Sequence, residues 1–231
     1  MNEQKLSKRL ASVAHYVRKN DRVADIGSDH AYLPAWLVLN QQIEYAVAGE
    51  VVEGPYQAAL KLVKQRKLDQ YITVRLGDGL DAIVTDDDIS AITIAGMGGS
   101  LISDILERGH QSGRLNGKER LILQPNVGEK TLRTWLMNHS YEIIAETLVM
   151  EDGRFYEIIV AEKVAKTVKY SLADLTFGVF LRTGYPDLFK EKWQADLLNR
   201  KRVLKQLEQA RQPQLEKIAE MTHMIKLIEA L

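Results

Sequence analysis

The stretch Arg22-Val-Ala-Asp-Ile-Gly-Ser-Asp-His-Ala-Tyr-Leu33 decides the fold that we predict for this chain. Its first part, residues 23–26, is mostly apolar and β-branched, which is typical of a buried strand. Gly27 ends that strand, and Asp29 and His30 precede the return of apolar residues, so a short loop and then a helix should follow. In an open α/β sheet, ligands bind at the edge where strands end in such loops, because backbone amides point outward there.

Strand and helix patterns alternate from this stretch to about residue 165. An amphipathic helix precedes it. The predicted strands are 22–27, 43–51, 71–76, 90–95 and 120–123, and the predicted helices between them are 32–40, 54–67, 100–108 and 129–139. Residues 141–150 and 155–162 should pair as a hairpin around Glu151-Asp-Gly-Arg154. A parallel βα series closed by an antiparallel hairpin is typical of the Rossmann-like class I methyltransferase sheet, whereas a dinucleotide-binding dehydrogenase usually continues with parallel strands.

The last part of the chain has a different pattern. Two long amphipathic helices, one from Pro186 and one from Leu215, are divided at Pro213, which predicts an antiparallel, coiled-coil-like helical hairpin. We therefore expect two domains, 1–165 and 166–231. The first carries 19 Lys and Arg against 23 Asp and Glu, and the second carries 12 against 8, so a polyanion should meet the second domain first. A monomer is expected because the two helices can bury their apolar stripes against each other; a dimer through this tail is the alternative.

Composition excludes several classes of protein. The chain has 231 residues, of which 45% are hydrophobic, so it can bury a sizeable core. The absence of cysteine excludes disulfides, thiolate metal sites and cysteine nucleophiles. No apolar run reaches the roughly 18 residues of a membrane span, so we expect a cytoplasmic protein without a membrane partner. The three acids Asp86–Asp88 are expected to form a solvated loop, and no metal is expected.

The acidic loop after the first strand indicates which ligand it holds. A dinucleotide site needs Gly-x-Gly-x-x-Gly so that the backbone can approach a pyrophosphate, and only Gly27 of the three glycines is present. A phosphate beside Asp29 would be repelled, and the P-loop lysine pattern is absent. An acidic loop instead suits a cationic ligand. S-adenosylmethionine carries a sulfonium and an ammonium group, which Asp25 and Asp29 could face.

Other strand ends add to this predicted site. Glu50 follows Asp25 by 25 residues, and a carboxylate there could accept hydrogen bonds from both hydroxyls of a ribose. Gly77-Asp78-Gly79 would let the backbone approach an adenine while the acid accepts from its amine. Gly96-Met97-Gly98-Gly99 leaves room for a flat ligand, and Gln124-Pro125-Asn126 could read a base edge. Each of these segments could equally be a plain turn or a cap.

Five motifs occur in a fixed order along the chain: Asp25-Ile-Gly-Ser-Asp-His30, Gly77-Asp-Gly-Leu80, Ala95-Gly-Met-Gly-Gly99, Gln124-Pro-Asn126 and Glu151-Asp-Gly-Arg-Phe-Tyr156. As a set they resemble the bacterial tRNA (adenine-N1)-methyltransferase family that modifies the adenosine at position 22. The resemblance spans about residues 1–163 and extends to the helical tail. It implies a Rossmann-like catalytic domain, S-adenosylmethionine as methyl donor, and a C-terminal helical domain that helps to hold tRNA.

The predicted site residues fall into three groups. Expected contacts with S-adenosylmethionine are Asp25, Ile26, Gly27, Ser28, Asp29, His30, Glu50, Gly77, Asp78, Gly79, Ala95, Gly96 and Met97. Expected contacts with tRNA are Arg9, Tyr32, Gln124, Pro125, Asn126, Arg154, Tyr156, Arg200 and Lys201. Asp29 and Asn126 are expected to act in catalysis. Asp29 would stabilise positive charge on the adenine rather than act as a base, because N1 already has a lone pair.

Two other functions stay open from the sequence. One is a class I methyltransferase that acts on a small molecule or on another RNA, with the helical tail as a lid or a dimer arm. The other is a non-catalytic module that binds an adenosine ligand. A chain that does not bind S-adenosylmethionine would be the non-catalytic module and neither kind of enzyme. Methylation of tRNA would distinguish the tRNA methyltransferase that the resemblance implies from a methyltransferase with another substrate.

Overall fold

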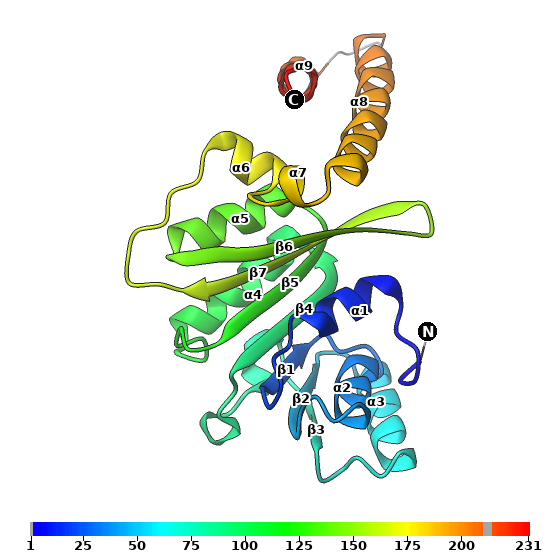
Figure 1. The fold of residues 1–231 in the computed structure, drawn as a ribbon, viewed down its shortest axis with the longest axis vertical. Helices are drawn as coiled ribbons and strands as arrows, with labels where there is room; N and C mark the ends of the chain where they lie inside the picture. The colour runs from blue at the N-terminus through cyan, green and yellow to red at the C-terminus, as the bar shows by residue number, and fades with distance from the viewer. Residues whose placement is uncertain (1, 210–213) are drawn as a thin grey trace. The chain divides into compact units, whose positions relative to one another are not determined.

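The computed structural model describes residues 2–209 and 214–231 (Figure 1). The chain divides into two compact units, one up to Leu181 and one from Arg182. This division lies further along the chain than the boundary after residue 165 that the sequence suggested. Helix α6 (Leu172–Phe177) packs against helix α5 (Glu129–Asn138), so residues beyond 165 belong to the first unit. None of the helices in the described ranges is long and apolar enough to cross a membrane.

A seven-stranded sheet forms the centre of the first unit. Its strands are β1 (Arg22–Ile26), β2 (Tyr45–Glu50), β3 (Ile72–Leu76), β4 (Ala91–Gly98), β5 (Arg120–Val127), β6 (Tyr141–Glu151) and β7 (Arg154–Lys163). Their order across the sheet is β3-β2-β1-β4-β5-β7-β6. The first five run parallel, and β7 runs antiparallel to both β5 and β6. This arrangement confirms the predicted Rossmann-like sheet closed by a hairpin.

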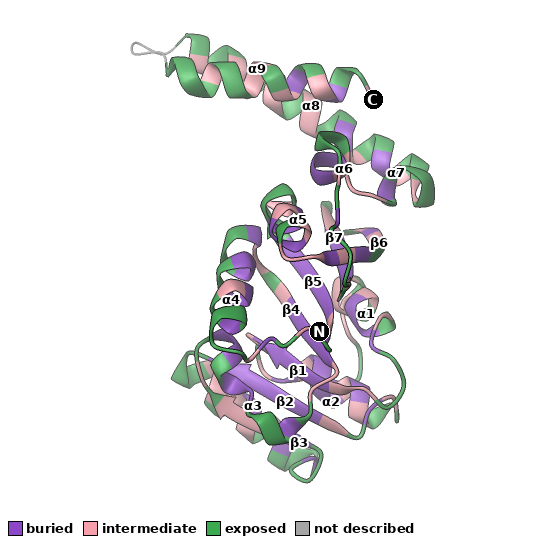
Figure 2. Ribbon diagram, turned by 90° about the vertical axis from the view of Figure 1, so that its left-hand side faces the viewer, coloured by how far each residue is buried: buried purple, intermediate pink, exposed green. Residues whose placement is uncertain are grey.

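Helices cover the two faces of the sheet and create two apolar cores. One core contains side chains of α4 (Gly99–Gln111) and α5, and the other contains side chains of α1 (Lys8–His15), α2 (Tyr32–Leu39) and α3 (Glu53–Gln65). Successive residues of a strand point to opposite faces, so Ala24 belongs to the first core and Val23 to the second. Figure 2 shows β1, β2 and β5 buried along most of their length. Burial on both faces explains why these strands are apolar runs and not alternating patterns.

Strands β4 and β5 run further than the sequence predicted. They stay paired through Ala95 and Gln124, Met97 and Pro125, and Gly98 and Val127, with two shifts of register. The glycine-rich segment and the Gln-Pro-Asn segment are therefore paired strand ends and not free loops. Register shifts of this kind bend a strand and redirect its side chains. Here they occur where the two strands reach the edge at which ligands are expected.

One predicted loop was wrong in part. Asp86 and Asp88 are exposed, as expected, but Asp87 is buried. Its carboxylate accepts hydrogen bonds from the Arg75 guanidinium and from the Tyr45 hydroxyl at 2.6 Å. Burial alone would raise the pKa of Asp87, but these hydrogen bonds outweigh it and lower the pKa. Asp87 thus joins the loop before β4 to strands β2 and β3.

The second unit consists mainly of helices α8 (Pro186–Glu208) and α9 (Leu215–Glu229), with α7 (Leu181–Gly184) at its start. The Arg182 guanidinium donates to the Leu231 carbonyl at 2.7 Å, and Arg200 contacts the Met221 sulfur, so the two long helices run antiparallel. Lys201 also pairs with Glu229 at 2.6 Å. The helical hairpin predicted from the sequence is present. The break predicted at Pro213 lies outside the described residues.

Candidate active site

A cavity of about 300 Å³ lies at the carboxyl edge of the sheet. Its walls come from α1, from the loop after β1, and from the ends of β4, β5 and β7. The lining residues are Arg9, Leu10, Asp25, Gly27, Ser28, Asp29, Leu33, Ala95, Gly96, Met97, Asn126 and Tyr156. All of these except Leu10 and Leu33 were predicted as site residues. The two leucines were missed because their spacing in helices α1 and α2 also suits an ordinary core position.

The loop after β1 has an unusual backbone. Asp29, His30 and Ala31 all have positive φ angles, of 44°, 72° and 56°. A side chain makes this left-handed region unfavourable by roughly 1–2 kcal/mol per residue, so three such residues in succession must be held by their surroundings. Strained backbone of this kind is concentrated at functional sites. Gly27 shares the left-handed conformation with a φ of 69°, but without a Cβ it carries little strain.

Strand β2 provides the support for this loop. The amides of Gly27 and Ser28 donate to the Gly49 carbonyl at 2.9 and 3.2 Å, and the Asp29 amide donates to the Glu50 carboxylate. Glu50 therefore fixes the loop with one oxygen and can offer the other to a ligand. The separation of these residues in the sequence is the usual one for a nucleotide-binding βαβ unit.

Asp25 and Glu50 are neighbouring buried carboxylates, of which Asp25 lines the cavity and Glu50 lies behind the lining. Asp25 accepts hydrogen bonds from the Ser28 and Thr93 hydroxyls, each at 2.6 Å. Burial raises the pKa of both Asp25 and Glu50, and the charge of Asp29 raises each further. Neither carboxylate forms an ion pair with Lys or Arg in the part of the chain that the structure describes. Such a site favours a ligand that brings positive charge and hydroxyl donors.

Thr93 is a residue that the sequence analysis missed. It lies in β4, where its hydroxyl is fully buried and points at Asp25. Buried polar groups need partners, so a threonine in the otherwise apolar run Ala91-Ile-Thr-Ile-Ala95 was the available signal.

The opposite wall of the cavity is built from amide groups. The buried Gln124 side chain accepts hydrogen bonds from the Arg9 guanidinium at 2.5 Å and from the Gly96 amide at 2.9 Å. It donates to the Asn126 side chain at 3.2 Å, and Asn126 in turn donates to the Gly96 carbonyl at 2.7 Å. These bonds define which end of each amide group is the donor. Gln124 thus orients Asn126, which lines the cavity, from behind the wall.

Arg9 comes from a helix far away in the sequence. The Lys8 amide donates to the Glu151 carboxylate at 2.5 Å, and the Tyr16 hydroxyl lies 2.6 Å from that of Thr147, so both ends of α1 are held on β6. The Arg9 guanidinium then lies 5.6 Å from the centre of the Tyr156 ring. This contact brings α1 and β7 together at the cavity.

The remaining predicted residues lie around the cavity or away from it. His30 contacts the Asp29 carboxylate at 2.7 Å and stacks on the Tyr32 ring, so both lie beside the site. Ile26 and Pro125 are buried behind the wall. Gly77, Asp78 and Gly79 adjoin Glu50, since the Gly77 amide donates to the Glu50 carbonyl at 2.7 Å.

Of the basic residues predicted to contact tRNA, Arg9 is one that lines this cavity. Arg154 is exposed beside the β6–β7 turn. Arg200 and Lys201 lie on α8 in the second unit, where they pair with Asp196 and Glu229. Their assignment as tRNA contacts stays a prediction.

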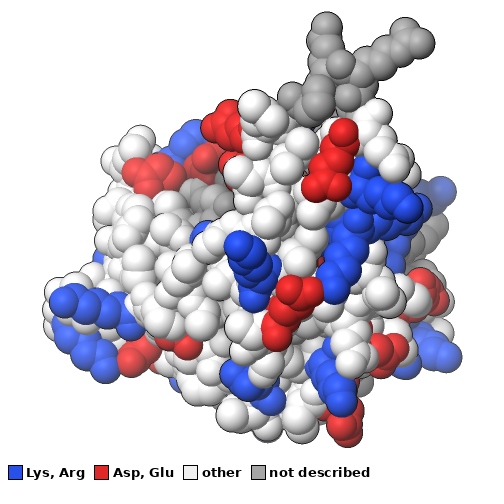
Figure 3. Space-filling model, turned by 90° about the horizontal axis from the view of Figure 1, so that it is seen from above, with Lys and Arg blue, Asp and Glu red and all other residues white. Residues whose placement is uncertain are grey.

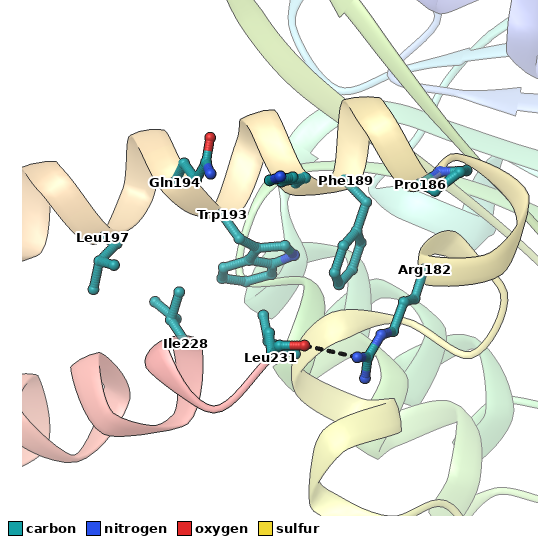
Figure 4. Close-up of a pocket in the computed structure, with 9 residues that line it drawn as sticks. Arg182, Pro186, Phe189, Trp193, Gln194, Leu197, Ile228 and Leu231 are labelled. Atoms are coloured by element: carbon teal, nitrogen blue, oxygen red, sulfur yellow. Dashed lines mark hydrogen bonds between the residues drawn. The ribbon is translucent and has the colours of Figure 1, made fainter.

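The second unit contains a cavity of its own, of about 380 Å³ (Figure 4). Phe189, Trp193 and Leu197 of α8 line it together with Ile228 of α9, and its charged side chains are Arg182 and Lys190. No carboxylate side chain occurs among the described residues that line it. It therefore lacks the negatively charged side chains that favour a ligand with an ammonium and a sulfonium group, and the cavity at the sheet edge is the better candidate.

The fold and the acidic residues of the cavity define the class of this protein: a Rossmann-like class I methyltransferase. Residues 23–230 match the family described as tRNA (adenine(22)-N(1))-methyltransferase. The chain belongs to this family.

Individual relatives agree with this assignment. A Bacillus subtilis tRNA (adenine(22)-N(1))-methyltransferase is 44% identical over 214 residues, which are 91% of this chain and 89% of the relative. A Streptococcus pneumoniae protein solved in complex with S-adenosyl-L-methionine is 44% identical, with 98% of this chain and 99% of that chain covered and a TM-score of 0.87. M. capricolum TrmK in complex with S-adenosyl-homocysteine is 30% identical, with 97% and 96% covered and a TM-score of 0.82.

Proposed function

We propose that this chain methylates N1 of adenosine 22 in tRNA with S-adenosylmethionine, and that the reaction takes place in the cavity at the sheet edge. The observation that carries the location is the pair of buried carboxylates, Asp25 and Glu50, which form no ion pair with a Lys or Arg among the described residues. Membership of the family supports methylation of tRNA as the reaction, and the residues at the strand ends support the cavity at the sheet edge as its place.

The residues of the cavity fit the chemical groups of S-adenosylmethionine. Carboxylates accept hydrogen bonds only, and Asp25 and Asp29 would face the positively charged end while Glu50 takes the ribose. A Cβ on Gly27 would lie 2.1 Å from the Met97 Cε, so a glycine at this position lets the Met97 side chain lie directly over the loop. Gly77, Asp78 and Gly79 adjoin Glu50 on the side where the adenine of the donor would lie.

The amide wall would receive the target base. When bound, S-adenosylmethionine supplies a methyl group on a positively charged sulfur, which the lone pair of adenine N1 can take without prior loss of a proton. The chain therefore needs to position the base, and no residue needs to act as a base catalyst. Asn126 offers hydrogen bonds to the edge of the adenine, and Tyr156 and Arg9 flank it. The Asp29 carboxylate is 72% exposed beside the cavity and would stabilise the positive charge on the methylated adenine.

The helical second unit, from Arg182 to Leu231, would contribute contacts with the tRNA backbone, with Arg200 and Lys201 among them. Figure 3 shows Lys and Arg interspersed with Asp and Glu on the face that it presents, so the surface there is not a single basic field. We expect several separate phosphate contacts, and binding should weaken as salt rises because counterions are released. The contact of α8 with α9 supports a monomer, because Phe189 and Trp193 of α8 and Ile225 and Ile228 of α9 are buried within the one chain. A tRNA substrate would place the reaction in the cytoplasm.

Methyl transfer to a defined atom tests the proposed function. Incubation with labelled S-adenosylmethionine and unmodified tRNA should place the label on N1 of adenosine 22. A transcript with guanosine at position 22 is the matched control and should stay unlabelled. Label on N6 of adenine, or on a guanine, would contradict the assignment.

A further inference from the structure

Two exposed aliphatic side chains follow closely, along the chain, the segments that line the cavity. Leu101, in the first turn of α4, is 48% exposed, and Val127, the last residue of β5, is 67% exposed. Single exposed aliphatic residues are common. These two differ because each follows a residue of the cavity lining by only a few positions: Met97 precedes Leu101, and Asn126 precedes Val127.

The backbone that carries these side chains is rigid. Gly98 pairs with Val127 at the end of the β4–β5 ladder. A Cβ on Gly99 would lie 2.1 Å from the Gly128 carbonyl oxygen, so the two chain segments touch through their backbones. The bond from Asn126 to the Gly96 carbonyl joins the same segments on the cavity side. Leu101 and Val127 are therefore fixed relative to the site where the target base would react.

The chemistry of N1 indicates what these side chains contact. N1 lies on the Watson–Crick edge, so a paired adenosine must leave the base stack before it can react, which costs a few kcal/mol. Proteins that open a stack commonly insert an aliphatic or aromatic side chain in place of the lost base. The residues between and beside Leu101 and Val127, namely Gly98, Ser100 and Gly128, carry no charge and little bulk, so the flat faces of bases can approach.

We propose that Leu101 and Val127 form an apolar wedge that enters the tRNA stack beside adenosine 22 and fills the space that the adenine leaves when it turns into the cavity. This inference rests on the proposed function. A second copy of the chain is a poorer occupant, since two side chains offer far less than the roughly 1,000 Å² of a stable protein interface.

The test compares two tRNA transcripts that differ in how firmly adenosine 22 is held. In one transcript the nucleotide opposite adenosine 22 pairs with it, and in the other that nucleotide is mismatched. The variants are Leu101→Ala, Val127→Ala and the double variant. Leu39→Ala and Val84→Ala are matched controls, because Leu39 and Val84 are 45% and 41% exposed and lie before strands β2 and β4, away from the carboxyl edge.

We expect the double variant to lose about tenfold or more in kcat/KM on the paired transcript and less than about twofold on the mismatched one, because a paired adenine costs more to extrude than a mismatched one. The two controls should match the wild-type chain on both transcripts. Affinity for S-adenosylmethionine and the unfolding midpoint should also stay unchanged in the double variant, which would show that the cavity and fold are intact.

Three outcomes would overturn the wedge. One is equal loss on both transcripts, which would mean general binding; another is no loss on either. The third is a change in molecular mass in solution on Val127→Asp, which would identify the surface as a contact between protein chains. If the wild-type chain methylated neither transcript at adenosine 22, the proposed function itself would fail, and the wedge with it.

Discussion

Two clusters of buried carboxylates in the first unit differ in one respect. Glu146 and Glu157 enclose the fully buried Arg133, which donates to Glu146 at 2.6 and 2.8 Å and also to Glu157. Asp25 and Glu50 are almost as deeply buried, but their donors are hydroxyl groups and a backbone amide. The first cluster contains its own cation, and the second does not within the described residues.

The difference separates a structural cluster from a binding site. Glu146 also accepts from the amides of Val179 and Phe180 at 2.6 and 2.9 Å, so the paired cluster fastens the segment before Leu181 onto the sheet. All its groups are satisfied by the chain itself. The unpaired cluster has raised pKa values, which means that the folded protein disfavours its charged form until a cation arrives. Removing a charge should therefore destabilise the folded chain at the paired cluster and stabilise it at the unpaired cluster.

The largest effect is expected at the paired cluster. Arg133→Met should lower the free energy of unfolding by about 3–5 kcal/mol, because two buried carboxylates lose their common partner. The measurement is chemical denaturation. Arg18→Met is the control, since the Arg18 pair with Glu162 is exposed and such pairs contribute little. A variant as stable as the wild-type chain would show that this cluster is not structural.

A smaller effect is expected at Glu50, and on binding instead of folding. In Glu50→Gln the amide oxygen can still accept from the Asp29 amide, but the other end becomes a donor and no longer accepts from a ribose hydroxyl. Hydrogen bonds to charged groups contribute about 1.5–3 kcal/mol, so affinity for S-adenosylmethionine should fall roughly 10–100-fold.

Calorimetry measures this loss. Glu53→Gln is its matched control, because Glu53 is exposed on α3 and bonds to Gln57. Unchanged affinity in Glu50→Gln would remove Glu50 from the ribose site.

Removing the charge of Asp25 should stabilise the folded chain, whereas removing the charge of Arg133 should destabilise it. Burial raises the pKa of Asp25 in the folded state more than the hydrogen bonds from Ser28 and Thr93 lower it. Its contribution to stability is therefore complete below the unfolded pKa of about 3.9 and is lost as pH rises through the higher folded pKa. Asp25→Asn removes this loss. It should stabilise the ligand-free chain at pH 7 by about 1 kcal/mol, which is the usual size of such stability–function trade-offs. The affinity of the variant for S-adenosylmethionine should fall.

Denaturation at pH 5 and pH 8 tests the sign. The wild-type chain should lose stability over this interval relative to Asp25→Asn. If the variant were instead less stable at pH 8 by the same margin as at pH 5, the carboxylate would be contributing to the fold and not to the site.

The two walls of the cavity also differ in how far the sequence could predict them. The carboxylate wall comes from residues 25–29 and is held from behind by Glu50, and a single βαβ unit places these residues together, so motif spacing was enough. The amide wall joins Arg9 to Gln124, which are 115 positions apart. Both residues were predicted as separate tRNA contacts, but their contact with each other depends on the packing of α1 against β6, which spacing along the chain does not encode.

The remaining differences have local causes. Strands β4 and β5 were predicted too short because glycine and proline usually end strands, whereas here the two ends pair with each other through shifted registers. Asp87 was misassigned because three consecutive acids suggest solvent, and its partners Arg75 and Tyr45 lie on neighbouring strands. The boundary between the units was placed early because the sequence gives no signal that Val179 and Phe180 bond to Glu146.

The smallest expected effect concerns Asp78, which the sequence predicts as the acceptor for the adenine amine of S-adenosylmethionine. Its carboxylate lies 2.9 Å from the Arg108 guanidinium, and both side chains are at least half exposed. In Asp78→Ala the neutral adenine amine loses the carboxylate that accepts its hydrogen bond, so the affinity for S-adenosylmethionine should fall about fivefold. Arg108→Ala breaks the same ion pair but keeps the acceptor, and affinity should change less than about twofold. Equal losses in the two variants would mean that the ion pair positions the loop, and no loss in either would place the adenine amine elsewhere. Because Asp78 has a cation partner and is open to solvent, it lies between the two clusters compared above: it can recognise a neutral amine, but it contributes little to attracting a charged ligand.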